Sequence, residues 1–171
     1  MTGMIDAMPQ ETLKRLRGMA YTAENVDWPA HLARRHGWQA ANRQYQARQR
    51  DLGRTEMEAL LEALDLQPPL PPDTLRDVLG AAVSIYLQTD ATTAEASFVE
   101  GSIRIRAVRC PLYDRLSDPS WHGLTACGCF ARIRGWHDAL DLEVDEDVLL
   151  NRKWGDAICE VVLHEPLPIV R

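Results

Sequence analysis

Apolar positions recur at helical spacing through the first half of the chain. The pattern predicts a helix from Pro9 to about Ala23, a second from Asp27 to Gly37, and a long helical stretch from Trp38 to Leu64. The spacing weakens near Gly53, so the long stretch predicts either two helices or one bent helix. The most regular apolar stripe lies between Asp73 and Leu87, and it is broad enough to serve either the core or the seam of a homodimer.

The periodicity changes from helical to alternating after Asp90. Apolar and polar residues alternate from Ala94 to Ala107 across a Glu100-Gly101 turn, which predicts a β-hairpin. A helix is expected from Leu124 to Leu140, and a second hairpin is expected to pair strands at about Leu140–Leu150 and Ala157–His164. The sequence therefore predicts an α+β fold, with an N-terminal helical half followed by a β-β-α-β-β antiparallel sheet and a helix packed on one face.

A proline-rich stretch divides the chain. Gln67-Pro68-Pro69-Leu70-Pro71-Pro72 cannot be helical, because prolines lack the backbone N–H donor and force an extended path. We therefore expect an N-terminal helical segment at residues 1–66, a linker at 67–72 and an α+β domain at 73–171. With 171 residues, 46% of them hydrophobic, the chain is long enough to bury one core, so these parts are expected to form one compact unit.

The net charge of −6 argues against a nucleic-acid-binding protein, because binding to phosphates requires a basic surface. No stretch approaches the roughly 18 apolar residues of a membrane span, and the segment from Met1 to Met8 lacks the features of a signal peptide. We expect a cytoplasmic protein whose partner is a small molecule rather than nucleic acid or membrane. In that reducing compartment, cysteines are expected as metal ligands, reactive thiols or buried apolar residues rather than as disulfides.

The four cysteines all lie in the last third of the chain, each near a predicted junction between elements: Cys110, Cys127, Cys129 and Cys159. Cys110 precedes Pro111, so a helix that begins there would place its thiol where the helix dipole stabilises a thiolate. Arg106 and Arg109 would lower the pKa of that thiol further and could hold a substrate carboxylate. Tyr113 could transfer a proton. The alternative is that Cys110 is a small apolar residue at the end of a strand.

Cys127 and Cys129 are two positions apart, which on a regular helix directs them about 200° apart and prevents both from binding one metal ion. A loop conformation would be needed to bring both to one place. Cys129 belongs to the apolar stripe of its helix, and Cys159 is expected to face the core unless that face of the sheet lines a cavity. A zinc site built from Cys110, Cys127 or Cys129, Cys159 and His122 has suitable ligand types but lacks the paired spacing of zinc ribbons.

Trp121 and its neighbour His122 lie in a predicted loop, where they could line a ligand cavity and contact a substrate. The alternatives without a binding role are a tryptophan at the edge of the core and a histidine on the surface. Sequence spacing does not separate the two interpretations.

Three C-terminal motifs together resemble the L-2-amino-thiazoline-4-carboxylate hydrolase-like family: Cys110-Pro111-Leu112-Tyr113, a cysteine in the following helix region, and Gly155-Asp156-Ala157-Ile158-Cys159. The helical N-terminal half, with Asp27-Trp28 and Gly37, is also similar to relatives of that family. The resemblance implies hydrolysis of a C–N bond in a cyclic amidine or a related small, amino-acid-derived substrate. It carries over five motif positions, namely Cys110, Tyr113, Cys127 or Cys129, Asp156 and Cys159.

The chain also resembles the 4-vinyl reductase-type ligand-binding domain, which ends in a Gly-Asp-x-x-Cys hairpin and in some sensors binds zinc. It departs from that pattern before the Gly155-Asp156 turn, where those sensors place a further cysteine and a glutamate. This sequence has Asn151 and Val148 in that region, which weakens the implied zinc site.

Two functions follow from these patterns. The first is a small-molecule hydrolase in which a cysteine thiol, or a metal held by cysteines, attacks the substrate. Its catalytic candidates are Cys110, Cys127, Tyr113 and Asp156, its substrate-binding candidates are Arg106, Arg109, Trp121 and His122, and its metal candidates are Cys110, Cys127 and Cys159. The second is a non-catalytic binding or sensor module with structural cysteines or zinc. An apolar cavity without arginine or carboxylate favours the binding module, whereas converging arginine, carboxylate and thiol groups favour the hydrolase.

Overall fold

The computed structural model describes residues 3–19, 28–87, 93–99, 102–110, 113, 124, 126–164 and 167–168, and it confirms the predicted α+β class. The helices are α1 (Gly3–Asp6), α2 (Gln10–Gly18), α3 (Trp28–His36), α4 (Trp38–Ala63), α5 (Pro72–Ala82), which continues as a π-helical turn (Val83–Leu87), and α7 (Gly128–Ala139). The strands are β1 (Thr93–Val99), β2 (Ser102–Arg109), β3 (Leu142–Glu143), β4 (Glu146–Leu150), β5 (Cys159–Leu163) and β6 (Leu167–Pro168). No helix in these ranges is both long and apolar enough to span a membrane.

The sheet joins the two predicted hairpins side by side. Its four strands are antiparallel in the order β1-β2-β5-β4, and β3 pairs separately with β6. The pairing of β2 with β5 places Ile105 opposite Val161 and Ala107 opposite Cys159. Every residue of β5 is buried, and the strand is paired with a neighbouring strand along both edges. The expected Glu100-Gly101 turn lies outside the described residues.

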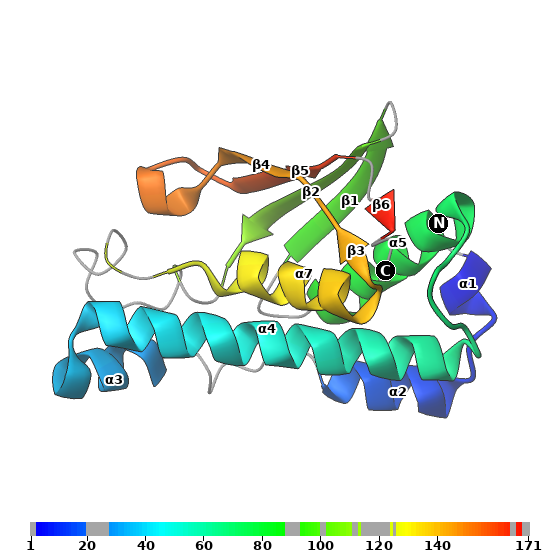
Figure 1. The fold of residues 1–171 in the computed structure, drawn as a ribbon, viewed down its shortest axis with the longest axis horizontal. Coiled ribbons are helices and arrows are strands. Elements are labelled where there is room, and N and C mark those ends of the chain that lie inside the picture. The colour runs from blue at the N-terminus through cyan, green and yellow to red at the C-terminus, as the bar shows by residue number, and fades with distance from the viewer. Residues whose placement is uncertain are drawn as a thin grey trace.

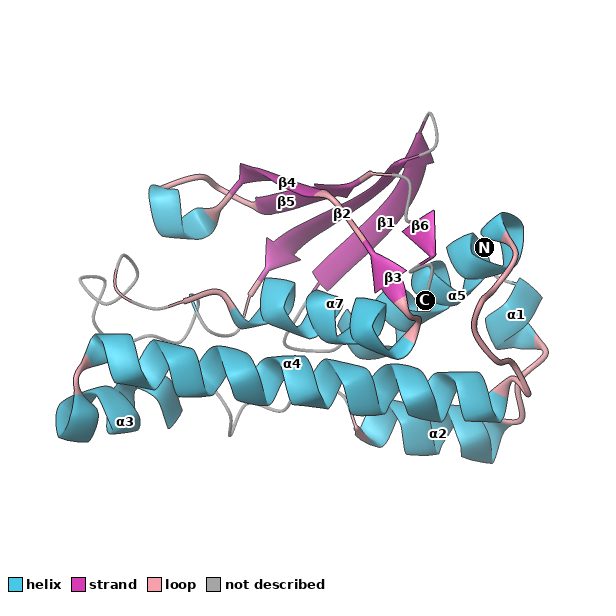
Figure 2. Cartoon of the chain, viewed as in Figure 1, coloured by secondary structure: helices cyan, strands magenta, loops and turns pink. Residues whose placement is uncertain are grey.

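The helices form layers below one face of the sheet (Figures 1 and 2). Helix α7 lies between the sheet and α4, and α4 in turn contacts α2 and α3. Gly37 separates α3 from α4 with a backbone φ of 77°, a conformation that glycine adopts without strain. From Trp38 to Ala63 the chain is a single helix of 26 residues, so Gly53 does not interrupt it.

One core unites the helical half with the sheet. Its buried residues include Leu16 and Leu60 from the first half of the chain and Trp136 and Val161 from the second. The regular stripe of α5 also joins this core, since its members Leu75, Val78 and Leu79 are all buried there. In this structure the α5 stripe therefore serves the core.

Helices α4 and α7 approach each other unusually closely. A Cβ atom on Gly53 would lie 2.0 Å from the backbone oxygen of Arg132, and one on Gly135 would lie 2.0 Å from the backbone oxygen of Arg50. Two glycines on opposite helices thus allow the two backbones to meet. Gly53, which weakens the helical pattern in the sequence, is the position on α4 where α7 rests.

A buried ion pair lies at the same crossing. The Arg132 guanidinium donates two hydrogen bonds to the Glu56 carboxylate, one of them 2.6 Å long, and both side chains are excluded from solvent. Trp136 Nε1 donates a further bond of 3.2 Å to Glu56, and the Tyr86 hydroxyl donates one of 2.8 Å to the Glu56 backbone oxygen. Burial raises the pKa of the Glu56 carboxyl, and the bonds from Arg132 and Trp136 oppose this effect. The charges are tolerated because each has hydrogen-bonding partners.

His137 is a second buried polar group on α7. Its side chain is 5% exposed, and its Nε2 atom has no hydrogen-bond partner among the described residues. Burial lowers its pKa from 6.5 to about 4; nearby Arg134 and Arg50 act in the same direction, and Asp138 opposes them. The imidazole is therefore neutral at neutral pH.

We expect Gly53→Ala and Gly135→Ala each to reduce the free energy of unfolding by about 1–3 kcal/mol or more, because the added methyl group meets a backbone atom that cannot rotate away. Gly18→Ala is the matched control. Among the described residues, no atom beyond its own helix backbone and chain neighbours lies within 4 Å of its added Cβ, so the change should be neutral or raise stability by up to about 1 kcal/mol through helix propensity. Urea unfolding measures all three. Unchanged stability of Gly53→Ala would mean that the helices can separate without cost.

Replacing one partner of the buried Glu56–Arg132 pair should destabilise the fold much more than replacing both partners. Glu56→Leu or Arg132→Met alone leaves an uncompensated buried charge, with an expected cost of about 3–5 kcal/mol. The double variant should recover a large part of that loss. Glu58→Gln breaks the exposed pair with Arg54, 4.0 Å apart, and should cost less than about 1 kcal/mol. Additive losses in the double variant would contradict the assigned pairing.

The buried histidine predicts a specific pH dependence of stability. The unfolded chain, with the ordinary pKa of 6.5, binds the proton more tightly than the folded protein does. Stability present above pH 6.5 should therefore be lost as the pH falls toward 4, by about 3 kcal/mol at most. Urea unfolding of His137→Gln at pH 7, 6, 5 and 4 should show a shallower loss than the unmodified protein. His31→Gln, at an exposed position on α3, should retain the original slope.

Candidate functional site

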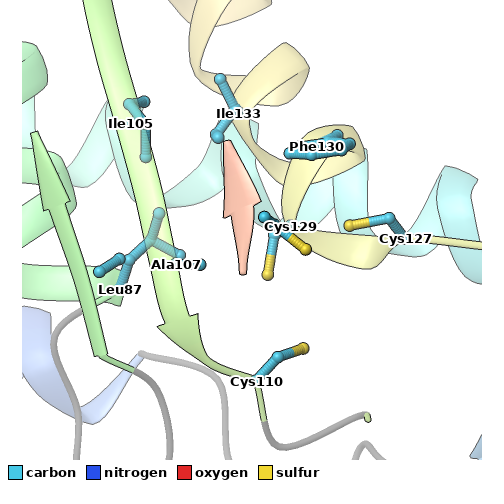
Figure 3. Close-up of a pocket in the computed structure, with 10 residues that line it drawn as sticks. Leu87, Ile105, Ala107, Cys110, Cys127, Cys129, Phe130 and Ile133 are labelled. Carbon is cyan, nitrogen blue, oxygen red and sulfur yellow. The ribbon is translucent and has the colours of Figure 1, made fainter. Parts of the chain in front are cut away.

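The structure brings all four cysteines to one small cavity between the start of α7 and the sheet (Figure 3). Six apolar residues of the described chain also line it: Leu87, Ala94, Ile105, Ala107, Phe130 and Ile133. The centre of a water-sized sphere can move within only about 20 Å³ of this cavity. The cavity therefore has room for about one small group. None of these lining residues carries a charge.

The cysteines reach the cavity from three elements. Cys110 follows the last residue of β2, Cys159 begins β5, and Cys129 lies in the first turn of α7. Cys127 is the residue that caps α7, with extended backbone angles of −71° and 121°. Because it lies outside the regular helix, the expected separation of about 200° between Cys127 and Cys129 does not apply, and both line the same cavity.

Helix α4 fixes the segment that carries Cys127. The Asn42 side chain donates to the carbonyl of Leu124 at 2.6 Å and accepts from the N–H of Ala126 at 2.9 Å. A Cβ on Gly128 would lie 2.4 Å from the Tyr45 hydroxyl, so glycine is needed for the first turn of α7 to lie against α4. Neither contact was expected from the sequence. The one available signal was an asparagine inside a helix, where it has low intrinsic propensity.

The thiols differ in their surroundings. Cys129 is hydrogen-bonded to Cys110, which lowers the pKa of its thiol, but a hydrogen bond with Cys127 and burial outweigh this effect and raise it. Burial also raises the pKa of Cys159, whose sulfur accepts from the N–H of Arg152 at 3.4 Å. Cys129 and Cys159 are therefore protonated at neutral pH and are poor nucleophiles.

Tyr113 is buried close to the cysteines. Burial raises the pKa of its phenol, and all four cysteines act in the same direction. The Arg152 guanidinium lies over its ring, 5.9 Å from the centre. The predicted helix start after Cys110 lies outside the described residues, apart from Tyr113 itself.

The other predicted site residues do not line the cavity. Arg106 faces away from it, since its neighbours Ile105 and Ala107 line it, and its guanidinium binds the Glu160 carboxylate at 2.5 Å. Arg109 is exposed at the end of β2. The Asp156 carboxylate accepts from the N–H of Asn151 at 2.8 Å and so closes the turn between β4 and β5. Trp121 and His122 lie outside the described residues.

Metal binding has no support in the arrangement of the described residues. Within the part of the chain that the structure describes, no three histidine, cysteine, aspartate or glutamate residues are placed so that they could hold a metal ion. The expected zinc site of Cys110, Cys127 and Cys159 therefore plays no part in the function proposed below.

Comparison with known proteins identifies a fold. No family model and no curated protein matches the chain. Among solved structures, it is similar to a trafficking protein particle complex subunit 3 from Naegleria fowleri, a structure described as covalently bound to palmitic acid. The TM-score is 0.57 at 16% identity, and the match covers 83% of this chain and 89% of that chain. At this identity the likeness establishes that this chain shares the fold of that subunit.

Proposed function

We propose that this chain is a non-catalytic module that binds an apolar group in the cysteine cavity. The observation that carries the proposal is the lining, which among the described residues combines six apolar side chains with four thiols and contains no arginine, histidine or carboxylate. Such a surface attracts an apolar group by the hydrophobic effect, and its described residues offer no partner to a charged substrate.

Hydrolysis of a cyclic amidine, the alternative that the motif resemblance implies, has less support. That reaction needs a nucleophile together with groups that bind and protonate a polar substrate. Arg106 is engaged with Glu160 on the other face of β2, and Asp156 is engaged in a turn. Two of the four thiols have raised pKa values. The gathering of the cysteines around Tyr113 is the remaining observation in favour of the hydrolase.

The structural neighbour is described as covalently bound to palmitic acid, and this supports a specific form of the ligand. The corresponding reaction here would be transfer of an acyl group from an acyl thioester donor to a cavity cysteine. The donor's C–S bond breaks, a new thioester forms at the cysteine, and the proton of the cysteine thiol passes to the departing thiolate. A long chain exceeds the space of about 20 Å³, so its entry would require side chains such as Phe130 to move.

The structural neighbour is also a subunit of a protein complex. We accordingly propose that this chain assembles with other chains. A homodimer, which the sequence left open, is one form of such assembly. A native mass spectrum counts the subunits directly.

Mass spectrometry tests the binding proposal. The protein is incubated with octanoyl- and palmitoyl-coenzyme A, and its mass is measured under native and denaturing conditions. A bound apolar group should appear as an increment lost on denaturation, or as an acyl increment that survives denaturation and is removed by neutral hydroxylamine. Ala107→Leu, which fills the cavity, should reduce the increment at least tenfold. Ala96→Leu is the matched control, because Ala96 lies on neighbouring β1 and is absent from the lining.

Two outcomes would contradict the proposal. One is the absence of any increment with either donor, and the other is an increment that Ala107→Leu leaves unchanged. Release of product from 2-amino-thiazoline-4-carboxylate, lost in Cys110→Ala or Cys127→Ala proteins that remain folded, would support the hydrolase instead.

A further inference from the structure

A second, solvent-open groove lies at the other end of α7. It has a volume of about 290 Å³, and it is bordered by α4, the last turns of α7, β3 and the start of β4. Its polar lining consists of Arg50, Arg134, His137, Asp138, Glu143 and Glu146. No described residue of this groove lines the cysteine cavity.

The charges of the groove favour a cationic ligand. Arg50 is bound by both oxygens of Asp138, at 2.6 and 2.7 Å, and Arg134 is bound by Glu146, with Nε at 2.7 Å. Glu143 is exposed and forms no ion pair with another described residue. Among the described residues, each arginine of the groove is thus neutralised by a carboxylate, and one negative charge remains in excess.

His137, which lines the same groove, carries a buried nitrogen that lacks a hydrogen-bond partner in the described part of the chain. The Nε2 atom of His137 has no hydrogen-bond partner among the described residues, and bulk water does not reach it. Leaving such an atom without a partner costs about 1–3 kcal/mol. The charged groups that act on this imidazole, Arg50, Arg134 and Asp138, are themselves members of the groove, so the ring lies beside it.

We propose that this groove binds a small organic cation, an ammonium or a guanidinium, whose N–H donates to Nε2 of His137 while Glu143 and Glu146 balance its charge. The acceptor role places the imidazole proton on Nδ1. Arg50 and Arg134 have half-exposed side chains and can move aside for the ligand to reach the ring. The bond to the ligand then satisfies a nitrogen that the folded chain leaves without a partner.

Nuclear magnetic resonance and calorimetry test this site with four probes. Methylguanidinium and putrescine are the cations, and acetate and inorganic phosphate are the anions. The cations should bind saturably, shift the ¹⁵N resonance of the His137 Nε2 atom and leave His31 unchanged. Glu143→Gln removes an exposed carboxylate, so the protein should stay folded and bind the cations roughly fivefold more weakly. Glu62→Gln, an exposed position three turns further along α4, should bind normally.

The proposal fails on any of three results. These are no saturable cation binding at 10 millimolar probe, binding of acetate or phosphate in place of the cations, and equal affinity of Glu143→Gln and the unmodified protein. His137→Phe provides a further readout, because it should abolish the histidine shift and weaken cation binding. If the buried His137→Phe substitution prevents folding, the cation affinity of Glu143→Gln still tests the proposed site.

Discussion

The close crossing of α4 and α7 is the constraint on which the rest of the structure depends. Two glycines, Gly53 and Gly135, allow backbone to meet backbone, and the buried Glu56–Arg132 pair fixes the rotation of one helix against the other. An ion pair without solvent tolerates little misplacement, because each unpaired charge would cost several kcal/mol. The glycines therefore set the distance between the helices, and the ion pair sets their register.

That register determines where the cysteines lie. The start of α7 is held by Asn42 through two backbone groups, and Gly128 lets it rest against Tyr45. Both of these partners belong to α4. The sheet then supplies the opposite wall of the cavity. The site thus depends on α4, although none of the residues that line the cavity comes from that helix.

The sequence predicted the helices and the sheet well, because hydrophobic periodicity records which face of an element is buried. It could not predict contacts that depend on how two elements meet. The weak pattern at Gly53 suggested a break in a helix. The glycine instead allows the backbone of α7 to lie against α4, and no local pattern in the sequence reveals the position of α7. The argument that Cys127 and Cys129 point apart assumed that both belong to the helix, and it failed because the helix begins at Gly128. Element ends are the least predictable part of a fold.

Helix α7 connects two sites of opposite character. One end meets the uncharged cysteine cavity and the other meets the acidic groove, while its middle is immobilised through Arg132 and Trp136. Twelve residues span about 18 Å, so the two sites are separated by a rigid element with no hinge along it. A ligand at either end adds contacts to a helix that is already fixed. Its binding energy therefore increases the stability of the whole fold by mass action.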